Sequence, residues 1–151
     1  MTIISTVRPN DRLSATGQRR LFLDTVFIQA TYNTRDQYHQ AAMALLPEVE
    51  TSAAWVTEAV LMEVGNGLSA VNRQGAVDFI RLCYQTPNIH VVSFDTALLD
   101  ESLQLYSNRD DKTWGLIDCM SFVVMQKRNI TEAVTADEHF IQAGYRALLL
   151  D

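Results

Sequence analysis

Short apolar segments alternate with amphipathic helical patterns from residue 21 to the end of this 151-residue chain. The apolar segments are nearly continuous runs, which is typical of parallel strands buried on both faces. Parallel strands need crossover connections, and these connections are usually helices. The pattern therefore predicts an α/β fold with helices covering both faces of a central parallel sheet. We predict strands at 21–25, 52–57, 88–94, 132–136 and 145–151.

The segments between these strands carry apolar residues at helical spacing. Asp36 stands at the start of the first long pattern, where an acid can cap a helix or favour its first turn. The polar segment 108–115 predicts a loop. We predict helices at 36–50, 58–69, 74–86, 96–108, 116–129 and 138–144.

The length of the chain favours one domain, since 151 residues can bury most of the surface that the unfolded chain exposes. Residues 1–19 show no sustained periodicity, so we predict an N-terminal arm followed by a domain at 20–151. Two interpretations of the arm stay open, a solvated tail and a basic segment that contacts RNA. The second would use Arg8, Arg12, Arg19 and the adjoining Arg20.

Composition excludes several classes of protein and site. No apolar run approaches the roughly 20 residues of a membrane-spanning helix, and the N-terminus lacks the apolar core of a signal peptide, so we expect a cytoplasmic protein without a membrane partner. The two cysteines, Cys83 and Cys119, lie in apolar helical patterns and are predicted to be buried thiols. The histidines are scattered without metal-ligand spacing, so a structural zinc site is not expected.

Four acidic residues stand where an apolar strand ends or near the start of an apolar helix: Asp24, Glu63, Asp118 and Asp137. Because ligands of open parallel sheets bind outside the carboxyl ends of the strands, this placement can gather the carboxylates at one edge. Several acids in one pocket repel one another unless a cation lies between them. Carboxylate oxygens are the ligands that Mg²⁺ and Mn²⁺ prefer. The pattern predicts a divalent metal site suited to phosphodiester hydrolysis.

Each acid also has a structural explanation. Asp24 and Asp137 can cap the helices that follow them. Asp118 lies in the apolar run GLIDCMSFVVM, where a buried carboxylate can instead pair with an arginine. Glu63 can be an exposed helix acid, and its rival Glu58 lies five positions away, on a different side of the helix.

The segments LFLDTVFI, VLMEVGNGLS, DKTWGLIDCMSF and VTADEHFIQAG, in this order and spacing, resemble the PIN-domain family of metal-dependent ribonucleases, which includes the VapC-type toxins. The resemblance runs from residue 20 to the C-terminus. It implies a three-layer α/β/α sandwich with a central parallel sheet. It also implies an acidic quartet around Mg²⁺ or Mn²⁺, formed by Asp24, Glu63, Asp118 and Asp137. By the same resemblance, supporting polar groups orient these ligands or contact the substrate: Thr25, Asn66, Ser121 and Thr135.

The resemblance further implies an endoribonuclease that hydrolyses single-stranded or loop RNA by in-line attack of water. For toxin-type members it implies a small antitoxin partner and a homodimer. Two alternatives stay open, a solitary RNA-processing nuclease and a non-catalytic RNA-binding or protein-binding module with the same fold. A haloacid-dehalogenase-like phosphatase is disfavoured, because that family needs a second Asp where this chain has Val26.

The net charge of −6 is unusual for a protein that binds nucleic acid. Neutralising the four acids with metal would leave a net charge of −2. Ten of the twelve basic residues are arginines, whose side chains suit forked contacts with phosphate. The charge balance is therefore compatible with an RNA substrate.

Overall fold

A five-stranded parallel sheet forms the centre of the computed structural model, which describes residues 17–151. The strand order is β3-β2-β1-β4-β5, and every neighbouring pair is parallel. The predicted α/β class is therefore confirmed. The strands are β1 (Arg20–Leu23), β2 (Ala53–Thr57), β3 (Ile89–Val92), β4 (Glu132–Val134) and β5 (Arg146–Ala147).

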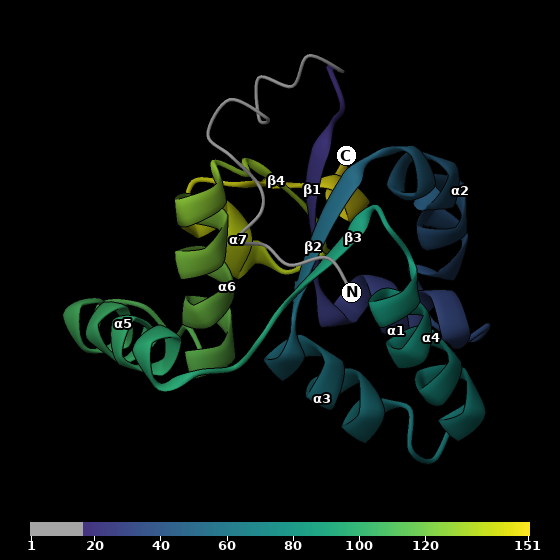
Figure 1. The fold of residues 1–151 in the computed structure, drawn as a ribbon, viewed down its shortest axis with the longest axis horizontal. Helices are drawn as coiled ribbons and strands as arrows, with labels where there is room; N and C mark the ends of the chain where they lie inside the picture. The colour runs from purple at the N-terminus through teal and green to yellow at the C-terminus, as the bar shows by residue number, and fades with distance from the viewer. Residues whose placement is uncertain (1–16) are drawn as a thin grey trace.

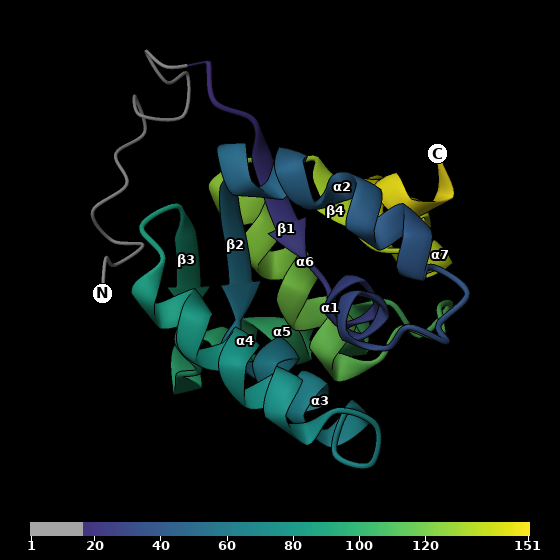
Figure 2. The same cartoon turned by 90° about the vertical axis from the view of Figure 1, so that its right-hand side faces the viewer.

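Helices cover both faces of this sheet, as the sandwich prediction requires. Helices α5, α6 and α7 lie on one side and α1, α2 and α4 on the other, while α3 lies beyond the carboxyl ends of the strands (Figures 1 and 2). The helices are α1 (Thr25–Tyr32), α2 (His39–Thr51), α3 (Glu58–Gly67), α4 (Arg73–Gln85), α5 (Thr96–Asn108), α6 (Leu116–Arg128) and α7 (Glu138–Gln142).

Aromatic packing fixes α6 and α7 against the sheet. The Phe140 ring of α7 lies 6.2 Å from Phe22 of β1 and 5.0 Å from Phe122 of α6, the latter edge to face. Phe22 and Phe140 are fully buried and Phe122 nearly so. Because these rings join three elements distant in sequence, they hold α6 and α7 against β1, and both helices begin beside predicted site residues.

The end of the chain differs from the prediction. Only Arg146–Ala147 of the predicted strand 145–151 joins the sheet, and Leu148–Leu150 forms a 3-10 turn. The backbone N–H of Leu149 donates to the carbonyl of Thr135, so the chain turns back over the end of β4. The position of Asp36 also differs from the prediction that it starts a helix. Helix α2 begins only at His39, and the Asp36 carboxylate accepts a hydrogen bond from the Tyr38 N–H at 2.8 Å.

Two arginines assigned to the N-terminal arm or its edge contact the domain. Arg19 pairs with Glu132 at 2.7 Å and with Glu48 at 3.0 Å. Arg20 donates to the Arg128 carbonyl at 2.6 Å, and its guanidinium lies 4.5 Å from the Trp55 ring. These two side chains therefore make contacts within the folded domain. Arg8 and Arg12 lie outside the described residues.

The prediction for the two cysteines is met within residues 17–151. Cys83 and Cys119 are buried free thiols, and burial raises the pKa of Cys83 to about 12. None of the helices in this part of the chain combines the length and apolarity needed to cross a bilayer.

Candidate active site

The pairing of β1 with β4 brings Asp24 and Asp137 to the same edge of the sheet. Asp24 follows β1 directly, and Thr135 and Asp137 follow the neighbouring strand β4. The Thr135 hydroxyl donates to Asp24 Oδ2 at 2.7 Å and accepts a hydrogen bond from the Asp137 N–H at 3.0 Å. One buried threonine therefore holds both acidic segments in place.

Asp24 is a buried carboxyl group in an acidic environment. Only 6% of the residue is exposed, and burial raises its pKa to about 7, even though the Thr135 hydrogen bond lowers it. The carboxylates of Asp118 and Asp137 raise this pKa further. Asp24 occupies the N-cap position of α1, but its side chain makes no capping hydrogen bond. Capping therefore does not explain its burial, whereas a neighbouring cation would stabilise the charged form.

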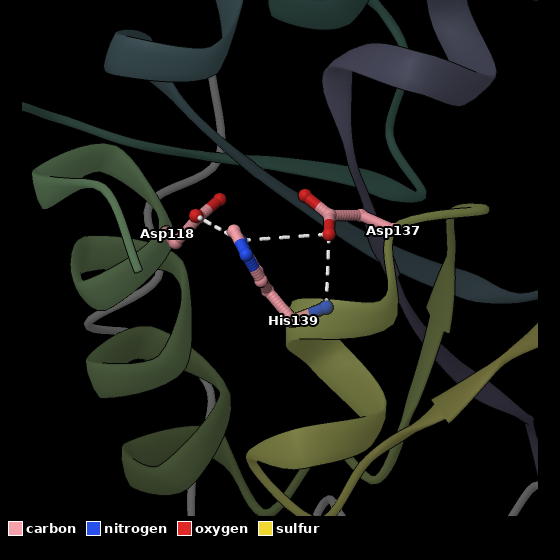
Figure 3. A group of neighbouring side chains, drawn as sticks. All are labelled: Asp118, Asp137 and His139. Carbon is pink, nitrogen blue, oxygen red and sulfur yellow. Dashed lines mark hydrogen bonds and ion pairs between the residues drawn. The ribbon is translucent and has the colours of Figure 1, made fainter. Parts of the chain in front are cut away.

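Asp118 and Asp137 lie on either side of the His139 imidazole (Figure 3). His139 Nδ1 lies 3.0 Å from Asp118 Oδ2 and 3.5 Å from Asp137 Oδ1. Asp137 Oδ1 also accepts the His139 N–H at 2.8 Å, so this acid does cap α7. One ligand atom from each of the three residues lies within 4.8 Å of the others. Among the described residues, Asp118 is thus paired with a histidine and not with the arginine considered as its alternative.

The hydrogen bonds of His139 indicate its role. His139 Nε2 lies 3.3 Å from the Thr113 hydroxyl, while Nδ1 faces Asp118. If the hydroxyl donates to Nε2, the proton of the neutral ring is on Nδ1, where it can be donated to Asp118. The Gly115 N–H donates to the same Asp118 oxygen at 3.0 Å. These contacts position Asp118 at the start of α6.

Glu63 joins the site through Thr25. The Thr25 hydroxyl donates to Glu63 Oε1 at 2.7 Å, and Thr25 follows Asp24 in the chain. Glu58 is engaged elsewhere, because it accepts hydrogen bonds from the Tyr84 hydroxyl at 2.5 Å and the Phe94 N–H at 2.8 Å. Glu63, not Glu58, is therefore the acid of α3 connected to the neighbourhood of Asp24.

Two of the predicted supporting residues lie outside the hydrogen bonds that connect the acids. Asn66 is exposed near the end of α3, and the hydrogen bonds of the described residues include none from its side chain to an acid. Ser121 is buried, but its hydroxyl donates to the Ile117 carbonyl at 3.1 Å, within its own helix. The structure thus connects six of the eight predicted positions through hydrogen bonds or direct sequence neighbours: Asp24, Thr25, Glu63, Asp118, Thr135 and Asp137.

His139 is the site residue that sequence reasoning missed. A single histidine carries no periodic or spacing signal, so the sequence alone indicates no role for the scattered histidines. The available signal was position, since His139 stands two residues after Asp137 in the first turn of α7.

The donor chemistry of the site fits a hard divalent cation. Its acidic side chains offer carboxylate oxygens, the ligands that suit Mg²⁺ and Mn²⁺. The hydrogen bond from His139 to Asp118 resembles the outer contacts that orient metal-ligating carboxylates. A cation among these groups would offset the repulsion that Asp118 and Asp137 exert on Asp24.

Comparison with known proteins agrees with this fold. The chain superposes on VapC20 of Mycobacterium tuberculosis, described as a sarcin-ricin loop cleaving toxin, with a TM-score of 0.74 and 24% identity over 83% of this chain and 95% of that chain. FitAcB of Neisseria gonorrhoeae matches with a TM-score of 0.57 and 17% identity over 84% of this chain and 94% of that chain. No curated protein sequence gives a significant match. The PIN domain family model matches residues 21–144, most of the sequence, and the chain therefore belongs to the PIN-domain family.

Proposed function

We propose that the protein is a cytoplasmic, Mg²⁺- or Mn²⁺-dependent endoribonuclease and the toxin of a toxin-antitoxin pair. The observation that supports this most strongly is the buried Asp24 carboxyl group, whose pKa is raised to about 7 by burial and by the neighbouring acids Asp118 and Asp137. A buried carboxyl group with a raised pKa, close to other acids at one sheet edge, is typical of functional sites. Membership of the PIN-domain family and the likeness to a structure described as a sarcin-ricin loop cleaving toxin support the same proposal.

In this proposal the cation is held by Asp24, Glu63, Asp118 and Asp137. When bound, Mg²⁺ or Mn²⁺ polarises a phosphoryl oxygen and lowers the pKa of a coordinated water. The protein supplies the orientation of the carboxylates: Thr135 holds Asp24, Thr25 holds Glu63, and His139 holds Asp118. This preorganisation aligns the scissile phosphate for in-line attack by water.

Water is the proposed nucleophile because the nearest hydroxyls are otherwise engaged. The hydroxyls of Thr25 and Thr135 donate their hydrogens to Glu63 and Asp24. In the proposed metal centre both adjoining carboxylates would be cation ligands, and Thr135 is fully buried, so neither threonine is placed to attack a phosphate. Direct hydrolysis without a covalent intermediate is therefore the simplest chemistry for this site.

The proposed substrate is single-stranded or loop RNA, whose flexible backbone can bring a phosphate to the buried edge of the sheet. The proposed antitoxin would inhibit by placing a basic side chain among the carboxylates, where it would replace the charge of the cation. A homodimer is also proposed, and size-exclusion chromatography with light scattering would measure it. A solitary RNA-processing nuclease is the second candidate, and a short reading frame directly upstream of the gene would favour the toxin.

Removal of the metal is the primary test of the proposed activity. Purified protein incubated with fluorescent single-stranded and hairpin RNAs is expected to cleave them in Mg²⁺ or Mn²⁺ and to stop when EDTA is added. Activity should return when the divalent cation is restored in excess. Cleavage that continues at the same rate in EDTA would contradict a metal-dependent mechanism.

The variant His139→Ala tests the positioning of Asp118. Loss of a group that orients a metal ligand typically lowers affinity or activity by about 10–100-fold. We expect a decrease in this range, with the loss partly recovered at high Mn²⁺, because the carboxylate remains but is less well oriented. Glu138→Gln, at the exposed neighbouring position, is the control and should keep full activity. Unchanged cation dependence in His139→Ala would exclude the positioning role.

A further inference from the structure

A cavity of about 460 Å³ lies between the end of α5 and the start of α6, beside the acidic site. Its walls include Tyr106, Arg109, Lys112, Thr113, Trp114 and Cys119. Two of these residues connect it to the acids. The Thr113 hydroxyl contacts His139 Nε2 at 3.3 Å, and Cys119 follows Asp118 in α6. A ligand in this cavity would therefore lie near His139 and Asp118.

Part of the wall is a guanidinium that lies over an indole ring. The Arg109 Cζ lies 4.8 Å from the centre of the Trp114 ring. Asp111 holds the guanidinium at its edge, accepting from Nε at 2.9 Å and from Nη2 at 3.1 Å. The Arg109 side chain stays 40% exposed. One face of the guanidinium is thus covered by the indole, and the opposite face is available to a second planar group.

Buried contacts hold the Trp114 ring in place, so Arg109 and Trp114 together form a rigid platform. Only 6% of Trp114 is exposed, and its indole N–H donates to Gln142 Oε1 at 3.0 Å. Its ring also packs edge to face on Phe122 at 5.0 Å. Because Phe122 belongs to the aromatic cluster that anchors α6 and α7, the platform and the acidic site are held by the same packing.

The chemistry of the cavity suits a nucleotide better than a free anion. Arg109 and Lys112 provide positive charge for a phosphate, but Asp110 also lines the cavity and would repel a small anion. Tyr106, half-exposed on the same wall, adds an aromatic ring. Planar bases of unpaired RNA stack on guanidinium groups and on aromatic rings.

We propose that this cavity binds the unpaired nucleotide next to the scissile phosphate, with its base stacked on the guanidinium of Arg109. This inference rests on the proposed RNA substrate and adds a binding subsite to it. Stacking would add binding energy that does not depend on the net charge of −6.

Binding to chelated protein tests the subsite without reading cleavage. The probe is a fluorescein-labelled, single-stranded RNA decamer titrated by anisotropy in EDTA. Stacking on one base contributes about 1–3 kcal/mol, so Arg109→Ala is expected to weaken binding about 5- to 140-fold. Arg109→Lys keeps the charge but loses the planar group, and should weaken binding nearly as much. Tyr106→Ala, at an exposed position with little risk to folding, should also weaken it.

The control is Arg81→Ala, which removes an exposed arginine from α4 on the opposite side of the sheet. This control should bind within about twofold of the wild type, since a remote exposed charge contributes little at moderate salt. Wild-type affinity in Arg109→Lys, equal losses in Arg109→Ala and the control, or no binding by the wild type would each overturn the subsite. A protein that binds RNA through Arg109 but never cleaves it would refute only the proposed nuclease activity.

Discussion

Asp118→Asn is expected to lower the rate of RNA cleavage by on the order of a hundredfold or more, with the fold unchanged. The asparagine side-chain oxygen can still accept the hydrogen bonds that Asp118 takes from the Gly115 N–H and from His139. The substitution therefore removes a negative charge and a cation ligand while it keeps the local contacts. Single-turnover cleavage of a labelled RNA in Mn²⁺ measures the loss.

A matched control separates this loss from a general effect of charge. Asp100→Asn makes the same chemical change at an exposed position of α5 and should cleave at the wild-type rate. Circular dichroism and thermal unfolding of both variants should match those of the wild type. Equal cleavage by Asp118→Asn and the wild-type protein would show that this carboxylate is not part of the catalytic site.

Asp24→Asn is expected to stabilise the metal-free protein at pH 8 while it abolishes activity. The pKa of Asp24 is about 7 in the folded protein, raised mainly by burial from an ordinary value of 3.8. Because the folded state disfavours the charged carboxylate, the free energy of unfolding decreases as the pH rises from about 4 to about 7. A shift of this size corresponds to on the order of 4 kcal/mol at pH 8. The neutral asparagine avoids this loss.

Measuring the stability at two pH values provides an internal control. Urea unfolding in EDTA should show Asp24→Asn to be more stable than the wild type at pH 8 and nearly equal to it at pH 4, where Asp24 is protonated. Added Mn²⁺ should stabilise the wild type at pH 8 and have little effect on the variant, since ligand binding to the folded state stabilises it. A variant that is less stable than the wild type at both pH values would contradict this view of Asp24.

The sequence predicted the fold well because its signals are local. Runs such as LFL and AAWV show buried strands directly, and β1 and β2 contain them. The carboxyl ends of adjacent parallel strands meet at one edge, which allowed the acids to be grouped before any contact was known. The end of the chain was mistaken because Leu148–Leu150 is as apolar as a strand, whereas its backbone turns back toward Thr135.

The parts of the site that could not be predicted depend on tertiary packing. The contact between His139 and Asp118 exists because Phe122 and Phe140 pack α6 against α7. No sequence pattern reports the angle between those helices. Ser121 shows that residues on one helical face need not contact each other. It shares a face of α6 with Asp118, but its hydroxyl donates to the carbonyl of Ile117, four residues earlier.

The most direct test of the central claim is the position of a bound cation. A crystal soaked in Mn²⁺ and measured near the manganese absorption edge would locate the ion by its anomalous signal. We predict a peak at bonding distance from carboxylate oxygens of Asp24, Asp118 and Asp137, with Glu63 bound directly or through water. Manganese bound only elsewhere, or an arginine of this chain lying among these carboxylates, would contradict the claim that they form a divalent metal centre.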